Sequence, residues 1–279
     1  MCSVTLKGTL PVIAGFLGAL AVLPGFQREF RVYPAMEGYD DLPLPSDYKA
    51  KAEFVVGRLM YPSRQGGRGG GGDWRQGRAS WTVDYPKGDR FFAAALRRLT
   101  RIDIRSVEQP VNPDDGDDIY NWPYLHVGMP SAWNITDAQA SRLRDYLLRG
   151  GFLLCDSFFG TEEWATFEVG MRRIFPDREV IEIPDRDPIF HTVFKLEERY
   201  QVGNFRSMIR DSTRPYRADG SVAYWRAIKD DKGRIMVAMA FNSDLGDSWQ
   251  LADELRYPEK YSALGLRIGV NYVIYALSH

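Results

Sequence analysis

The chain has 279 residues, of which 44% are hydrophobic and 26% are charged, and these proportions suit a globular domain with a large core. The formal net charge is -1, and the Lys and Arg residues are scattered along the chain. Composition therefore argues against nucleic acid or an acidic membrane surface as a partner.

The first 23 residues have the pattern of a secretory signal peptide. Lys7 precedes an apolar run over residues 10–23, and the small residues Ala19 and Ala21 suit a signal peptidase. The run is shorter than the ~20 apolar residues of a membrane span, and an uncleaved anchor at the N-terminus is the alternative. We expect an exported protein of the periplasm or cell envelope, in which cleavage removes Cys2 and leaves Cys155 as the single thiol.

Residues 24–52 are rich in Pro, Asp and Tyr and show no periodicity, so we interpret them as an extended linker before one domain, residues 53–279. A glycine run at 66–72 follows the first predicted strand but lacks the Gly-Lys-Ser/Thr that a phosphate-binding loop needs. It predicts a mobile surface loop. Four arginines flank or interrupt it and would make it a cationic lid: Arg64, Arg68, Arg75 and Arg78.

The best-defined part of the chain is a helix followed by an apolar strand. Thr136 and Gln139 form a capping box at the helix start, and Gly150 is the expected left-handed residue at its end. The strand at 152–155 is apolar on both faces, as a parallel sheet covered by helices on both sides requires. Asp156 is the first polar residue after that strand.

The remaining pattern alternates strands with helices and predicts an α/β fold with a mostly parallel sheet. The predicted strands are 53–61, 102–107, 124–127, 152–155 and 180–183, with a hairpin formed by 222–229 and 234–241. Besides the capped helix, the predicted helices are 89–99, one that begins near residue 162, and a closing helix at 262–277.

Three stretches resemble the ThuA-like branch of the class I glutamine-amidotransferase-like fold: the glycine pair 150–151, DPIFHTVFKLEERY at 187–200 and KGRIMVAMAFNSDLGD at 232–247. The closer resemblance, over residues 54–277, is to the bacterial family called domain of unknown function 4159, whose hallmarks look like WTVDYP, YLLRGGFLLCD and FNSDLGD. It implies a flavodoxin-like three-layer sandwich with a mostly parallel central sheet, usually behind a secretion signal. It brings no established activity.

The chain departs from the amidotransferase pattern at the catalytic positions. That pattern places a nucleophilic Cys in the turn after the central strand, whereas here the turn holds Asp156, and Cys155 lies inside the strand on the other face. ThuA-like proteins tend to carry His at that turn and after a late strand, where this chain has Asp156 and Asn242. The three histidines are His126, His191 and His279. We expect no Cys–His pair and no glutaminase activity, and interpret His126 as a core residue.

Polar residues gather where the strands end, at the edge of the sheet where such folds bind ligands. Asp156, Asn242 and Asp84 are the candidate catalytic residues. The candidate ligand-binding residues are Gly128, Asp156, Asn242, Asp244, Asp247 and Trp81. Carboxylates without His suit either a hard cation or acid–base chemistry on a glycosidic bond, but Asp and Asn at strand ends also cap helices and turns, as Asp156 would for the next helix. No metal and no cofactor is assigned.

Two functions follow as hypotheses. The first is a non-catalytic envelope protein whose domain binds a small molecule or an envelope protein. The second is a divergent hydrolase, acting on carbohydrate, that uses Asp156 with other carboxylates.

Overall fold

The structure is a computed structural model that describes residues 27–38, 41–64 and 72–279. The predicted signal peptide and most of the glycine run lie outside the described residues, so the lid hypothesis stays a prediction. Within the described part of the chain, no helix combines the length and the apolar character that a membrane crossing requires.

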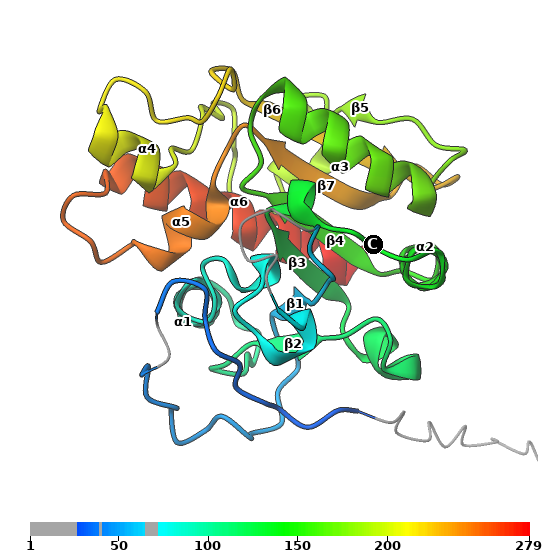
Figure 1. Ribbon diagram of the computed structural model, residues 1–279. Helices are drawn as coiled ribbons and strands as arrows, with labels where there is room; N and C mark the ends of the chain where they lie inside the picture. Colours follow the sequence, from blue (N-terminus) through cyan, green and yellow to red (C-terminus); the bar gives the residue numbers. More distant parts are fainter. Residues whose placement is uncertain (1–26, 39–40, 65–71) are drawn as a thin grey trace, which may run out of the picture.

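The domain is built on a seven-stranded mixed sheet in the order β2-β1-β3-β4-β7-β6-β5 (Figure 1). The first five strands in this order are parallel, β6 is antiparallel to β7, and β5 is antiparallel to β6. This confirms the predicted α/β class with a mostly parallel sheet. The strands are β1 (Gly57–Leu59), β2 (Gln109–Val111), β3 (Tyr124–Gly128), β4 (Phe152–Asp156), β5 (Ile181–Glu182), β6 (Tyr224–Lys229) and β7 (Ile235–Phe241).

Helices cover both faces of the sheet (Figure 1). On one face α1 (Lys87–Leu99) packs against α5 (Leu245–Gln250) and α6 (Glu259–Ser278). On the other face α2 (Asp137–Leu148) packs against α3 (Gly160–Ile174). The short α4 (Phe205–Arg210) lies in the long connection between β5 and β6.

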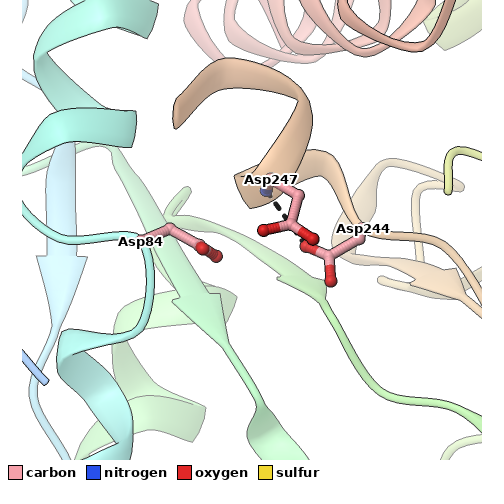
Figure 2. Close-up of side chains that lie close together, drawn as sticks. All are labelled: Asp84, Asp244 and Asp247. Carbon is pink, nitrogen blue, oxygen red and sulfur yellow. Dashed lines mark hydrogen bonds between the residues drawn. The ribbon is translucent and has the colours of Figure 1, made fainter. Parts of the chain in front are cut away.

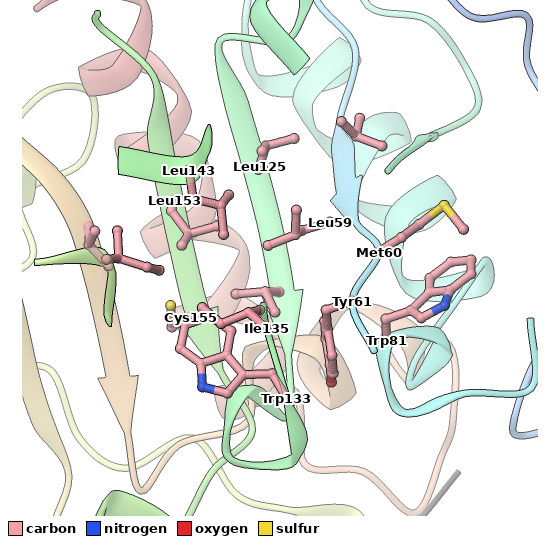
Figure 3. Packing of buried hydrophobic residues seen from close by; sticks show 14 of the residues in the cluster. Leu59, Met60, Tyr61, Trp81, Leu125, Trp133, Ile135, Leu143, Leu153 and Cys155 are labelled. Atoms are coloured by element: carbon pink, nitrogen blue, oxygen red, sulfur yellow. The ribbon is translucent and has the colours of Figure 1, made fainter. Parts of the chain in front are cut away.

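Strand β4 shows why the sheet needs two helical layers. Leu153 and Cys155 belong to the core under α2 and α3 (Figure 3), and Phe152 and Leu154 belong to the core under α1, α5 and α6. Successive side chains of a strand point to opposite faces, so a strand that is apolar throughout is buried only between two layers. The fully apolar strand in the sequence is thus the central one.

Helix α2 begins and ends as its sequence predicts. The Gln139 backbone N–H donates to Thr136 Oγ1 (3.2 Å), and the Thr136 N–H donates to the Gln139 side chain (3.0 Å), which completes the capping box. Such a cap contributes about 0.5–2 kcal/mol. Gly150 follows the helix with φ of 115°, a conformation that disfavours any residue with a Cβ.

The predicted strand at 102–107 is wrong. There, only Ile104 pairs with the sheet, as an isolated bridge to Phe54, and the edge strand β2 lies at Gln109–Val111 instead. Pro110 has no N–H to donate, which confines such a strand to an edge of the sheet. Strand β1 is likewise shorter than the predicted 53–61.

The described part of the predicted linker, residues 27–38 and 41–52, contains no helix or strand but lies on the domain. The Tyr33 N–H donates to the Tyr85 hydroxyl (3.2 Å), and the Arg78 N–H donates to the Pro34 carbonyl (2.8 Å). Ala35 is buried. The segment leads to Glu37, which contacts the candidate site described next.

Candidate functional site

The chain makes tight turns at the carboxyl edge of the sheet, where β3, β4 and β7 end. Met129, Ser157 and Asn242, one after each strand, have φ of 51°, 58° and 63°, and Asp84, just before α1, has φ of 59°. Residues other than glycine rarely adopt this left-handed backbone and keep it only where the surroundings impose it. Here buried backbone hydrogen bonds impose it, such as the one from the Ser157 N–H to the Ser243 carbonyl (3.0 Å).

Three aspartates meet at this edge and are called here the acidic cluster: Asp84, Asp244 and Asp247 (Figure 2). One carboxylate oxygen from each lies within 4.8 Å of those of the other two. Asp84 and Asp244 are 1% exposed, and Asp247 is 8% exposed. Three of the five acids and amides predicted as catalytic or ligand-binding residues thus lie together in a buried place.

Hydrogen bonds hold the two aspartates of this cluster that come from the FNSDLGD stretch. Asp244 caps α5, because its Oδ1 accepts from the Asp247 N–H (3.0 Å), and its Oδ2 accepts from Ser157 Oγ and Asn204 Nδ2 (both 2.9 Å). Asp247 Oδ2 accepts from the Phe205 N–H (2.7 Å) and from Asn204 Nδ2 (3.1 Å). Both carboxylates therefore have fixed orientations.

Asp84 differs from the other two. Its Oδ2 is buried and has no hydrogen-bond partner. The side chain points at α5 across Gly246, where a Cβ atom would lie only 2.0 Å from that oxygen. Glycine at position 246 is thus what lets Asp84 approach α5. A buried, unpartnered carboxylate oxygen is unfavourable unless a ligand compensates it.

Burial and like charge raise the pKa of every member of the acidic cluster. Desolvation is the largest cause, and it raises the pKa of Asp84 and Asp247 well above the usual range, with Asp244 as the next cause for both. The pKa of Asp244 is raised by burial and then by Asp156. Glu37 adds further negative charge, with its Oε2 accepting from Gln250 Nε2 (2.8 Å) and from the Asp84 N–H (3.3 Å).

A buried chain of charged groups lies beside the cluster, and its members Arg58 and Asp89 were not among the predicted site residues. Arg58 donates to both carboxylate oxygens of Asp89, with its Nη2 2.9 Å from each, and all of these groups are fully buried. Burial alone would raise the pKa of Asp89, but the Arg58 guanidinium lowers it below its usual value. The signal that could have revealed this pair is an arginine inside the otherwise apolar strand β1.

His126 continues this chain toward the cluster. Its Nε2 lies 2.6 Å from Asp156 Oδ1, and its Nδ1 lies 3.8 Å from Asp89 Oδ1 without a hydrogen-bond partner. Asp156 Oδ2 accepts from the Gly246 N–H (2.7 Å) at the start of α5. His126 is buried, as its interpretation as a core residue predicts. The sequence did not predict its polar contact with Asp156.

The alternative interpretation of Asp156 as a cap of the following helix is wrong. Its carboxylate contacts His126 and α5, whereas the first N–H of α3, that of Gly160, donates to Asn242 Oδ1 (2.8 Å). Asn242 Nδ2 donates in turn to the Val222 carbonyl (2.6 Å). Asn242 therefore ties α3 to the end of β7, and within the described residues no hydrogen bond joins it to Asp84 or Asp156.

Gly128 and Trp81 lie near the site but bring no side-chain group to the acidic cluster. Gly128 pairs with Asp156 in the sheet, and a Cβ there would lie 2.6 Å from the Val83 side chain. Trp81 is fully buried, with its Nε1 donating to the Trp74 carbonyl (2.8 Å). Gly128 and Trp81 therefore contribute to close packing around the site.

Cys155 and His126 lie on opposite faces of the sheet. Cys155 belongs to the core under α2 and α3, whereas His126 stacks edge-on against Trp249 of α5, with 4.9 Å between the ring centroids. Burial raises the pKa of the Cys155 thiol well above its ordinary value. In the described residues no hydrogen bond links Cys155 to a histidine.

These features define an α/β domain with a buried acidic cluster at the carboxyl edge of a mostly parallel sheet. The family model described as Domain of unknown function (DUF4159) matches residues 73–277, and the chain belongs to this family. No curated protein matches the chain.

Proposed function

We propose that this protein is an exported cell-envelope protein whose domain binds a small molecule or a partner protein at the carboxyl edge of its sheet, without catalysing a reaction. The observation that carries the proposal is the environment of Cys155 and Asp156. In an amidotransferase-like fold the nucleophile would follow the central strand, but here the thiol is buried under α2 and α3, and Asp156 is held by His126 and Gly246. A nucleophile needs an accessible, activated group.

The strand order supports an amidotransferase-like, flavodoxin-like class for this domain. The parallel part of the sheet runs β2-β1-β3-β4-β7, which is the order 2-1-3-4-5 of flavodoxin-like sheets once its strands are counted in sequence. Sheets of this type bind ligands outside the carboxyl ends of their strands, which is where the acidic cluster lies.

A hollow of about 370 Å³ at the carboxyl end of β7, next to the start of α3, supports binding of a small polar ligand. Its walls combine aromatic rings with hydrogen-bonding groups, and they include Trp164, Tyr224, Phe241, Asp219 and Asn242. Saccharides bind to this mixture of flat apolar surface and polar groups. Saccharides are therefore the first ligands to screen.

The alternative is a divergent carbohydrate hydrolase, for which the raised pKa of Asp84 would suit a general acid. The spacing of the carboxylates argues against it. Their oxygens lie within 4.8 Å of one another, whereas the two carboxyl groups of glycosidases are about 5–5.5 Å apart in retaining enzymes and about 6.5–9.5 Å apart in inverting enzymes. The spacing is too short for the inverting arrangement, which holds a water between its acids, and the burial of all three acids hinders access of a saccharide.

The test combines turnover with binding. The purified chain is incubated with glutamine and with a panel of chromogenic glycosides and esters, and a thermal-shift screen of saccharides is run on the same sample. We expect rates equal to the buffer blank and a rise in melting temperature with at least one saccharide. Saturable turnover that is lost in Asp156→Asn or Asp84→Asn would overturn the proposal in favour of the hydrolase.

A further inference from the structure

We propose that the acidic cluster, Asp84, Asp244 and Asp247, is a binding site for a hard divalent cation, with Ca²⁺ preferred over Mg²⁺. The inference rests on the proposed function, because it names a ligand for the same edge of the sheet. It follows from the spacing of the oxygens, from the unpartnered Asp84 oxygen and from the local charge.

The oxygens have the spacing that one ion requires. Ca²⁺ binds oxygen at 2.3–2.6 Å, so two donors on opposite sides of the ion are at most about 5 Å apart. One oxygen from each aspartate meets this limit, since all three lie within 4.8 Å of one another. The three aspartates come from two separate segments, so the ion would link the chain before α1 to the start of α5.

Asp84 supplies an independent indication of a ligand. Its side chain is almost fully buried, its Oδ2 has no hydrogen-bond partner, and it points at the other two carboxylates (Figure 2). Nearly every buried polar atom in a native protein is partnered. A cation between Asp84 and α5 gives this oxygen its partner.

The negative charge of the cluster also favours a bound cation. Among the ion pairs of residues 27–38, 41–64 and 72–279, none includes a member of the acidic cluster. Two arginines that interact electrostatically with the cluster form ion pairs elsewhere: Arg58 binds Asp89, and Arg217 binds Glu163 (2.9 Å). Buried carboxylates are found paired or bound to metal. No side-chain cation of the described residues pairs directly with these three carboxylates, and a bound metal ion would supply this compensation.

The donor set selects the kind of ion. Carboxylate oxygens without imidazole or thiolate favour hard cations over transition metals. Mg²⁺ usually keeps several waters and takes one or two carboxylates, whereas Ca²⁺ accepts several carboxylates in irregular geometry. Three buried carboxylates therefore favour Ca²⁺. Asn204, which donates to both Asp244 and Asp247, and Ser157, which donates to Asp244, would act as outer partners that orient the ligands.

The inference is tested by calorimetric titration of the full chain, in metal-free buffer, with CaCl₂ and separately with MgCl₂. We expect one Ca²⁺ per chain with weaker binding of Mg²⁺, and a melting temperature that rises with Ca²⁺ concentration. The absence of Ca²⁺ binding up to about 10 mM, ten times the weakest range of extracellular calcium modules, would overturn the inference. Tighter binding of Mg²⁺ would overturn the preference for Ca²⁺.

Variants identify the ligands. Asp84→Asn and Asp247→Asn lie on different segments, and each should weaken Ca²⁺ binding at least tenfold. Asp117→Asn is the matched control, because Asp117 is an exposed acid, with 85% of its side chain accessible, in the acidic loop 112–118. It should change the affinity less than twofold. An equal loss in Asp117→Asn and Asp84→Asn would mean diffuse attraction by negative charge and would contradict the site.

A loss of folding is distinguishable from a loss of ligands. The Asn variants remove like charge from a buried cluster, so without Ca²⁺ they should melt at the same temperature as the unmodified chain or higher. A lower melting temperature of these variants without Ca²⁺ would contradict repulsion between the carboxylates of the acidic cluster. Turnover of a substrate by a chain that binds Ca²⁺ overturns only the proposed function. A chain that binds a saccharide but no cation overturns only this inference.

Discussion

His126 Nε2 lies 2.6 Å from Asp156 Oδ1, and both side chains are fully buried between the end of β3 and the start of α5. The second Asp156 oxygen accepts from the Gly246 N–H (2.7 Å). Asp156 thus links a histidine on one strand to the helix that carries Asp247. It is a positioning residue for the acidic cluster, since it holds α5 where Asp84 can face it.

Replacing Asp156 should destabilise the fold. In Asp156→Asn, Oδ1 can still accept from the Gly246 N–H, but Nδ2 can only donate, so His126 must change tautomer to accept at Nε2. We expect a loss of about 1–3 kcal/mol in the free energy of unfolding, because a hydrogen bond to a carboxylate is replaced by a weaker one to a neutral amide, measured by urea denaturation. An unchanged free energy of unfolding would show that the His126–Asp156 contact contributes nothing to stability.

Cys155 should be chemically inert in the folded protein. Its thiol is fully buried and burial raises its pKa, so the reactive thiolate is scarce and inaccessible. In a Cys2→Ala chain, which leaves Cys155 as the only thiol, a thiol reagent should label the protein only after denaturant is added. Rapid labelling without denaturant would contradict the burial. Cys155→Ala should lower stability by ~1 kcal/mol through lost packing.

Gly246→Ala should be destabilising although helix propensity favours it. Alanine in place of glycine inside a helix contributes about 1 kcal/mol of stability, but a Cβ here would lie 2.0 Å from Asp84 Oδ2. We expect a net loss of about 1–3 kcal/mol from the clash, measured by urea denaturation. Gly72→Ala is a control at an open site, because no atom of the described residues lies within 4 Å of its added Cβ. Equal stability of the two variants would refute the close approach of Asp84 to α5.

Glu108 should make stability depend on pH. It is fully buried, and burial raises its pKa in spite of the Arg90 guanidinium, whose Nε lies 3.1 Å away. Because the folded pKa is raised, the folded state holds this proton more tightly than the unfolded state. The stabilisation that Glu108 contributes to the folded state is complete below its unfolded pKa of about 4.3. It is lost as the pH rises through its folded pKa.

The free energy of unfolding of the unmodified chain should therefore fall relative to that of Glu108→Gln as the pH rises from about 4 to about 8. Asp177→Asn is a control of opposite sign, because hydrogen bonding to Arg144 lowers the pKa of Asp177 to about 2. The free energy of unfolding of the unmodified chain should exceed that of Asp177→Asn at about pH 4, and this difference should disappear as the pH falls to about 2. A difference between the unmodified chain and Glu108→Gln that stays constant with pH would contradict the raised pKa.

A signal peptidase should remove residues 1–21 when the protein is exported. The apolar run and the small residues Ala19 and Ala21 predict cleavage after residue 21. N-terminal sequencing of the protein recovered from its native envelope should find residues 1–21 absent. Recovery of an intact Met1 would instead support an uncleaved membrane anchor.

The sequence by itself determined the elements whose signals are local. The capping box at Thr136 predicted the start of α2, the apolar run at 152–155 predicted a central strand, and the alternation of strands and helices predicted an α/β sheet that is mostly parallel. Each depends on residues a few positions apart, where spacing alone reports which side chains share a face. The polar residues after β4 and β7 likewise marked the edge at which the candidate site lies.

Only the tertiary structure decided which of these residues meet. Asp84 reaches α5 because β3, β4 and β7 are neighbours in the sheet and α1 packs against α5, and no local spacing records that arrangement. α5 itself has six residues, too few for a helical period to appear in the sequence. The Arg58–Asp89 pair and the His126–Asp156 contact also join residues far apart in the chain. Such contacts form only when folding brings distant segments together, so they are a property of the packed sheet and its helices.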